Sequence, residues 1–153
     1  MRHEFPPRIG EVYVPTAVLG DGISATVYRC VDATGRAVAV KVMRKNLFLR
    51  EEDRGLFLEG CGAARRVSHQ NLVRVFHADA KGAYPFVAMQ LVEGVTLRQV
   101  IDRRREEGVP FTLAEVEPIV TQVAGALDYL HTMMPAHGLV KPENLIVVPD
   151  LLK

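Results

Sequence analysis

Gly20, Gly22 and Lys41 are the residues whose types and spacing most directly suggest chemistry. The two glycines stand in the run Leu-Gly-Asp-Gly-Ile-Ser-Ala-Thr-Val at positions 19–27. Because glycine lacks a Cβ, the backbone amides beside it can approach a phosphate closely. Lys41 lies between apolar neighbours, and a lysine on a buried strand is costly unless it meets an anion. A plain hairpin turn and a lysine that reaches solvent are the alternatives, but the combination predicts a phosphate-bearing ligand.

Composition indicates a globular domain and excludes several partner classes. The chain has 153 residues, of which 48% are apolar and 24% charged, with a net charge of +1, so no long-range field favours nucleic acid or an anionic membrane. Cys30 and Cys61 are too few for a disulfide framework, which predicts a reduced, cytoplasmic protein. We expect no signal peptide, and no membrane span within this chain, because no uncharged stretch reaches about 18 residues.

Alternating apolar residues predict a strand-rich first half that would position the glycines and Lys41. Residues 1–11 look like an irregular leader, and Asp32–Gly35 looks like a turn. The expected strands are 12–14, 17–19, 25–31, 38–42, 72–78 and 86–90. A helix is expected over 50–67, with Phe57, Cys61 and Ala64 on one face. Its three internal glycines each cost about 1 kcal/mol, so this helix should be weak and mobile.

The second half reads as helical, which makes the fold class α+β. A short amphipathic helix is expected from Thr96 to Arg105, followed by a solvated end in which Arg103 pairs with Glu107. A longer helix should run from Thr112 to Thr132 and begin with a capping box between Thr112 and Glu115. Its periodicity predicts burial of Val116, Ile119, Val120, Val123, Leu127 and Leu130.

The order of the motifs resembles that of a bacterial-type serine/threonine protein kinase domain. The glycine run is similar to G-x-G-x-x-G-x-V with Ala25 at the third glycine, and Val-Ala-Val-Lys (38–41) is similar to the V-A-I-K strand. The run His-Gln-Asn-Leu-Val (69–73) resembles H-P-N-L-V, and 86–94 resembles the hinge. The run His-Gly-Leu-Val-Lys-Pro-Glu-Asn (137–144) resembles the catalytic loop H-R-D-L-x-x-x-N.

This resemblance implies a protein kinase-like fold and a nucleotide site. Residues 12–92 would form the N-lobe, a five-stranded antiparallel sheet with one helix, together with the hinge. Residues 93–153 would form a partial helical C-lobe through the catalytic loop. Met89 would be the gatekeeper, with the Gln90 carbonyl and the Val92 amide facing adenine. The implied nucleotide-binding residues are Gly20, Gly22, Ala25, Val27, Ala39, Lys41, Met89, Gln90, Val92 and Ile146, of which Val27, Ala39 and Ile146 would sandwich the purine.

Three departures from the family pattern bear on catalysis. Leu139 stands where the family has its catalytic aspartate, and leucine has no lone pair with which to accept a proton. Gly138 replaces the adjacent arginine, whereas Asn144 keeps the magnesium position. The glutamate that pairs with the strand lysine would fall at Gly60. The nearest acid, Glu59, is one residue off, so either a local irregularity restores the pair or Lys41 lacks it.

The sequence therefore predicts a pseudokinase: a regulatory or scaffold module with weak ATP or ADP binding, Mg²⁺ held by Asn144, and no phosphotransferase activity. His137 would be a structural packing residue. One alternative is the N-terminal part of a divergent serine/threonine kinase, because no D-F-G segment occurs before Lys153. The other is an interaction module without nucleotide. The apolar face of the helix 113–132, extended by Met133 and Met134, predicts self-association or an unknown protein partner.

Overall fold

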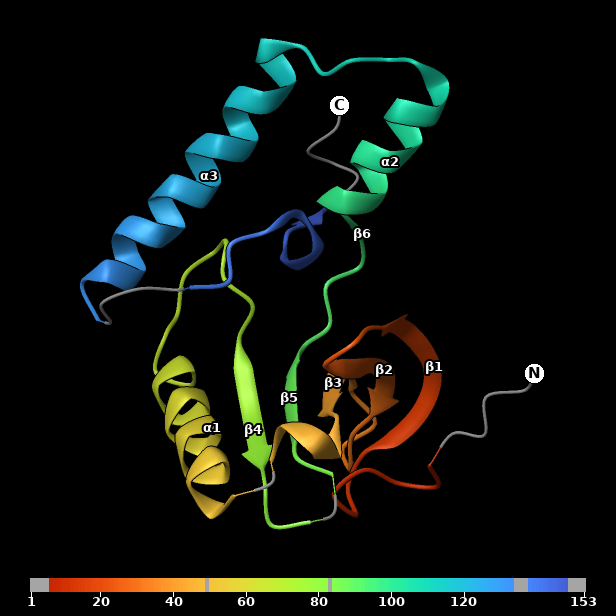
Figure 1. Cartoon of the computed structure of the whole chain (residues 1–153), viewed down its shortest axis with the longest axis vertical. Helices are drawn as coiled ribbons and strands as arrows, with labels where there is room; N and C mark the ends of the chain where they lie inside the picture. The colour runs from red at the N-terminus through yellow and green to blue at the C-terminus, as the bar shows by residue number, and fades with distance from the viewer. Residues whose placement is uncertain (1–5, 49, 83, 134–137, 149–153) are drawn as a thin grey trace. The chain divides into compact units, whose positions relative to one another are not determined.

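The computed structural model describes residues 6–48, 50–82, 84–133 and 138–148 (Figure 1). The chain divides into two compact units. The first comprises residues 1–68 and 73–91, and the second comprises 69–72 and 92–153. Among the described residues, none of the helices combines the length and the apolar character that crossing a membrane requires.

The first unit is built on a five-stranded antiparallel sheet, which confirms the expected architecture. Its spatial order is β1-β2-β3-β5-β4. The strands are β1 (Val14–Asp21), β2 (Ala25–Val31), β3 (Ala37–Met43), β4 (Val75–Asp79) and β5 (Phe86–Gln90). β1 contains the strand expected at 17–19 but only Val14 of the strand expected at 12–14, and its register shifts twice against β2. The strand expected at 72–78 begins only at Val75.

The core of this unit lies on one face of the sheet and includes residues that precede β1. Ile9 and Tyr13 join in a tight turn through reciprocal backbone hydrogen bonds of 2.8 and 3.0 Å, and both are buried. They pack with Cys30, Val38, Val40, Phe86 and Ala88. Ile9, which lies in the segment 1–11 predicted to be an irregular leader, is therefore part of the core. A buried apolar side chain anchors this segment, and its removal from water stabilises the turn.

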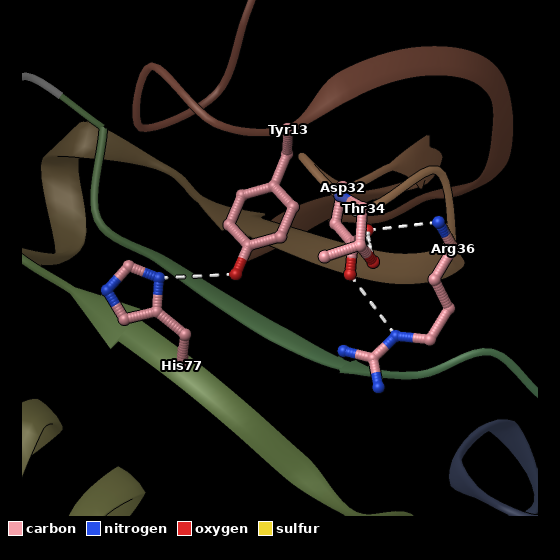
Figure 2. A network of polar contacts seen from close by, with 5 residues as sticks. All are labelled: Tyr13, Asp32, Thr34, Arg36 and His77. Carbon is pink, nitrogen blue, oxygen red and sulfur yellow. Dashed lines mark hydrogen bonds and ion pairs between the residues drawn. The ribbon is translucent and has the colours of Figure 1, made fainter.

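Figure 2 shows polar contacts around this core, at Tyr13 and at the turn between β2 and β3. The Tyr13 hydroxyl lies 3.3 Å from His77 Nδ1. The expected turn at 32–35 is confirmed, since the Asp32 carboxylate accepts hydrogen bonds from the Thr34 hydroxyl at 2.7 Å and from Arg36 Nε at 3.2 Å. The Thr34 hydroxyl is the main reason why the pKa of Asp32 falls to about 2. The Arg36 guanidinium also stacks on Phe76, 4.4 Å from the ring centroid.

The helix of the first unit, α1 (Glu51–Ala64), runs beside β4 after the single turn η1 (Lys45–Leu47) (Figure 1). Phe57, Cys61 and Ala64 are half-buried, as expected for one face, but no residue of α1 is fully buried. Burial raises the pKa of the Cys61 thiol. Arg54 fixes the helix to the β4–β5 loop by donating to the carbonyls of Ala80 and Gly82.

The second unit contains the helices α2 (Leu97–Glu107) and α3 (Leu113–His131). Both begin with capping residues: the Gln99 side chain accepts from the Thr96 N–H at 2.8 Å, and the Glu115 carboxylate accepts from the Thr112 N–H at 2.9 Å. The capping box expected at Thr112 is confirmed.

Arg104 joins the end of α2 to the start of α3. Its guanidinium forms a two-pronged ion pair with the Glu115 carboxylate and stacks on the Phe111 ring at 4.4 Å. The expectation that Arg103 pairs with Glu107 is wrong for the described residues, which contain no such ion pair. Arg104 gains a bidentate partner with ring stacking, which is a stronger arrangement than an exposed pair within one helix.

The apolar face of α3 is only partly covered. Ala126 and Leu130 are buried, but Val120 is 58% exposed, so its expected burial is wrong. Val116, Ile119, Val123 and Leu127 are half-buried. The face lines a groove of about 320 Å³ formed by Leu97, Ile119, Val120, Val123, Ala124, Leu127 and Leu145. A helix with more apolar residues than its own unit can cover leaves such a surface.

Candidate nucleotide site and catalytic loop

The register of the sheet places four of the predicted nucleotide-binding side chains on one face. Val27 lies opposite Lys41, and Ala39 lies opposite Met89. Because side chains alternate between faces along a strand, these residues point away from the core that contains Val38 and Val40. Ala39 is buried and Lys41 is half-buried. The sheet thus presents an apolar wall that carries Lys41, which suits a planar base joined to an anionic group.

The glycine turn between β1 and β2 is closed by its own backbone. The Gly22 N–H donates to the Ala25 carbonyl at 2.9 Å, and Gly20 lies opposite Val27 in the ladder. The Gly22 amide is therefore already bonded, and a phosphate that used this amide would have to replace an internal hydrogen bond. We therefore expect contacts between the glycine turn and a nucleotide phosphate to contribute little to the affinity for the nucleotide.

The end of β5 holds the residues that were predicted to face adenine. The Gln90 N–H donates to the Arg74 carbonyl at 2.8 Å, and the Gln90 side-chain oxygen accepts from the Arg74 N–H at 3.4 Å. The backbone of β5 is thus fixed up to its last residue by β4 and the residue before it. Val92 follows in the second unit. The assignment of the Gln90 carbonyl and Val92 amide to adenine stays a prediction.

Lys41 and Glu59 form no ion pair in the part of the chain that the structure describes. Glu59 is exposed on α1, whereas the half-buried face of that helix carries Phe57 and Cys61. A residue two positions from Phe57 on a helix points about 200° away from it. The Lys41–Glu59 pair stays a prediction that would require rotation of α1.

In the second unit, a two-stranded sheet positions Ile146. β6 (Val95–Thr96) pairs with β7 (Ile146–Val147), and the Leu97 N–H donates to the Leu145 carbonyl at 2.8 Å. Gly94 allows this close approach, because a Cβ there would lie 2.5 Å from the Val147 carbonyl oxygen. Ile146 is left partly exposed, so its side chain is available for a ligand.

The catalytic-loop region is held by backbone and side-chain bonds around the short helix η2 (Pro142–Asn144). The Asn144 side-chain amide donates to the Leu139 carbonyl at 2.8 Å. The Leu139 side chain is 61% exposed and supplies no acid or base. Gly138 has φ +73°, a left-handed conformation that side chains rarely adopt. His137 lies outside the described residues.

Glu143 is the only acid between Gly138 and Val148, and its carboxylate is paired with Arg98. Its carboxylate accepts from Arg98 Nε at 3.0 Å. A hydrogen bond from its own backbone N–H, followed by the bond from Arg98, lowers the pKa of Glu143. The carboxylate nearest in sequence to Leu139 is therefore already bound to Arg98.

Asn144 alone would offer Mg²⁺ one side-chain oxygen. The described residues contain no group of three or more His, Cys, Asp or Glu side chains that could hold a metal. Mg²⁺ prefers six oxygen ligands and often takes several from bound phosphates and water. The residues therefore fit a metal that arrives with a nucleotide, not a metal site made by the protein alone.

The sequence profile of the protein kinase domain matches residues 13–153. The chain belongs to the protein kinase family. This kinase domain is 31% identical over 133 residues to a probable serine/threonine-protein kinase of Clostridium acetobutylicum, which covers 86% of the chain and 20% of the relative. It is 32% identical over 139 residues to the serine/threonine-protein kinase PknL of Mycobacterium tuberculosis, covering 90% of the chain and 34% of PknL.

Solved structures agree with this assignment. The kinase domain of Mycobacterium tuberculosis PknI superimposes with a TM-score of 0.80 at 27% identity, over 90% of this chain and 55% of PknI's domain. The expected kinase-like α+β fold is thus confirmed. The chain spans about half of that solved kinase domain and 20% and 34% of the two curated relatives named above.

Sequence reasoning missed two residues that organise this kinase domain. Arg98 binds Glu143, and Arg44 binds the glycine turn at Asp21. The register of the β1–β2–β3 meander could have identified Arg44. Asp21 lies opposite Thr26, and Thr26 lies opposite Val42. Arg44 follows Val42 by two residues and so lies near Asp21. No local signal pairs Arg98 with Glu143, which lies 45 residues away in the chain.

Proposed function

We propose that this kinase domain is a pseudokinase, a regulatory or scaffold module that binds an adenine nucleotide weakly and transfers no phosphate. The observation that carries the proposal is Leu139 at the position of the catalytic aspartate. Phosphoryl transfer by kinases needs a group that accepts the proton of the attacking hydroxyl or orients it. Leucine does neither, and the neighbouring acid Glu143 is bound to Arg98.

The geometry of the first unit supports nucleotide binding. Val27, Ala39 and Met89 offer apolar contact on the same face that carries Lys41, the cation for a phosphate. Three features argue that phosphate adds little: the Gly22 amide is bonded to Ala25, Lys41 lacks an ion pair with Glu59 among the described residues, and Asn144 alone would offer one metal ligand. Adenosine contacts should therefore contribute most of the affinity.

A thermal-shift titration with adenosine, ADP and ATP–Mg²⁺ tests the binding part of the proposal. A ligand that binds only the folded protein raises its stability by mass action. We expect adenosine and ADP to raise the unfolding temperature at millimolar concentration, and Lys41→Ala to reduce the ADP shift but not the adenosine shift. Lys81→Ala, which removes an exposed lysine from the β4–β5 loop, is the matched control.

Two results would contradict the proposal in different ways. A well-folded protein that shows no shift with any of the three ligands is an interaction module without nucleotide. Transfer of phosphate to a protein substrate would make the chain part of a divergent serine/threonine kinase.

The cytoplasmic setting inferred from the cysteines belongs to the same proposal, and both thiols are free in the structure.

A further inference from the structure

Arg44, just after β3, is bonded to three residues of the glycine turn. Its Nη2 atom donates to the Asp21 carboxylate at 2.6 Å and to the Gly22 carbonyl at 3.1 Å. Its backbone N–H donates to the Ser24 carbonyl at 2.9 Å. A single residue just after β3 thus bonds to three residues of the turn that joins β1 and β2.

Thr26 completes this arrangement at the start of β2. Its hydroxyl donates to the same Asp21 oxygen at 2.6 Å. Thr26 is a buried polar residue, so its hydroxyl needs a partner, and Asp21 supplies one. The Asp21 carboxylate therefore accepts from both Arg44 and a buried hydroxyl, and these two bonds restrict the conformation of the Asp21 side chain.

These bonds lie behind the turn, opposite the face that carries Lys41. Thr26 lies opposite Val42, and the next residue, Val27, lies opposite Lys41. Successive side chains of a strand point to opposite faces. The bonds from Thr26 to Asp21 and from Asp21 to Arg44 are consequently on the reverse side from the predicted nucleotide face, and they leave that face clear.

We propose that Arg44 is a positioning residue for the nucleotide phosphates, acting through Asp21 and the glycine turn without touching the ligand. This inference rests on the proposed nucleotide binding. A glycine-rich turn has many accessible conformations, and ordering it during binding lowers affinity. By fixing Asp21, Gly22 and Ser24 beforehand, Arg44 removes part of that cost for any ligand that contacts the turn.

The expected effect is modest and restricted to phosphate-bearing ligands. The side chains of Arg44 and Asp21 are 44% and 47% exposed, and an exposed ion pair on its own contributes little. The side chain also orders the Gly22 carbonyl, whereas the bond to the Ser24 carbonyl comes from the Arg44 backbone and persists when the side chain is replaced. We expect loss of the Arg44 side chain to weaken ADP binding by about threefold to tenfold. Adenosine, which has no phosphate, should bind unchanged.

A double-mutant cycle measured by calorimetry tests the proposal. The variants are Arg44→Met, Asp21→Asn and the double variant, each titrated with ADP and with adenosine. Both single variants should weaken ADP binding, and the double variant should weaken it by less than the sum of the two single effects, because both changes remove the shared Arg44–Asp21 ion pair. Arg44→Lys keeps the charge and should retain part of the ADP affinity. The unfolding temperature of each variant establishes that it is folded.

Three outcomes would overturn the proposal. If Arg44→Met weakened and Asp21→Asn strengthened ADP binding, Arg44 would act as a general positive charge. If wild type bound ADP and every variant bound it equally, the positioning role alone would fail. If adenosine affinity fell as much as ADP affinity, the change would be a general structural defect. A wild type that binds neither ligand would instead refute the nucleotide-binding function itself.

Discussion

The Asn144 side-chain amide donates a hydrogen bond of 2.8 Å to the backbone carbonyl of Leu139. This bond uses only the backbone at position 139, so it does not depend on which side chain stands there. The catalytic-loop conformation between these residues is therefore compatible with leucine. The backbone carbonyl at position 139 makes this bond whatever the side chain, whereas the leucine side chain itself offers no proton acceptor.

Restoring the acid should not restore catalysis. We expect Leu139→Asp to fold and to remain without phosphotransferase activity, because catalytic groups that act as a unit are not additive. Gly138 still replaces the adjacent arginine, and Lys41 still lacks a partner among the described residues. Radiolabelled phosphate transfer measures the outcome, with Lys41→Ala in the same background as the control. Transfer above that control would show that the aspartate alone was missing.

Gly138 should resist substitution for conformational reasons. With φ +73° and open space around its Cβ position, Gly138→Ala should lower the free energy of unfolding by about 1–2 kcal/mol. Gly138→Asn should cost less, because asparagine tolerates this region better. Gly125→Ala, within the exposed side of α3, is the matched control and should be stabilising by about 1 kcal/mol. Urea unfolding gives all three values, and equal effects at the two glycines would contradict the conformational account.

The link between α2 and α3 should make stability depend on pH in the acid range. The Arg104 guanidinium, aided by the Thr112 N–H and hydroxyl, lowers the pKa of Glu115 to about 2 from its usual 4.5. A lowered pKa means that the stabilisation is fully present above pH 4.5 and is lost as the pH falls towards 2.

Comparison of Glu115→Gln with wild type isolates this contribution. Glu115→Gln should be less stable than wild type at pH 7, and the difference should shrink as the pH falls from 4.5 to 2. Urea unfolding at several pH values measures it. Asp32→Asn serves as a comparison for the same pH dependence in the first unit. The pKa of Asp32 is also about 2, and its partners Thr34 and Arg36 lie in that unit. A difference between Glu115→Gln and wild type that does not vary with pH would contradict the assigned cause.

The uncovered face of α3 should drive self-association of this chain. Leu113, Val120 and Met133 are exposed, and Val120 borders the apolar groove. Burying one such aliphatic side chain contributes roughly 1.5–3 kcal/mol. We expect light scattering at micromolar concentration to report a mass above that of the monomer, and Val120→Glu to lower it. Ile23→Glu, at a fully exposed position of the glycine turn, is the control. A wild type that stays monomeric would contradict this prediction.

Local patterns predicted the elements well and their partners poorly. The alternation in 25–31 and 38–42 indicated two strands whose observed register aligns Val27 with Lys41, and the Thr112–Glu115 spacing indicated the start of α3. These signals are local because strand periodicity and helix capping involve residues close in sequence. The kinase resemblance supplied the single five-stranded antiparallel sheet, which periodicity alone does not contain.

The residues that were mispredicted depend on contacts between distant segments. Ile9 is buried because Phe86 and its neighbours cover it, and Arg104 prefers Glu115 to the acids of its own helix. Val120 is exposed because the described part of its own unit does not cover the whole apolar face of α3. Such outcomes follow from packing between elements, and the composition of a single segment does not determine them.

Transfer of the γ-phosphate from radiolabelled ATP tests the central claim most directly. The purified chain is incubated with ATP, Mg²⁺ and a generic protein substrate, under conditions in which adenosine binding has been observed by thermal shift, and Lys41→Ala serves as the background. Because Leu139 offers no proton acceptor and Glu143 is bound to Arg98, we predict no label above that background in either the substrate or the chain itself. Label above the background, abolished by Lys41→Ala, would contradict the pseudokinase account.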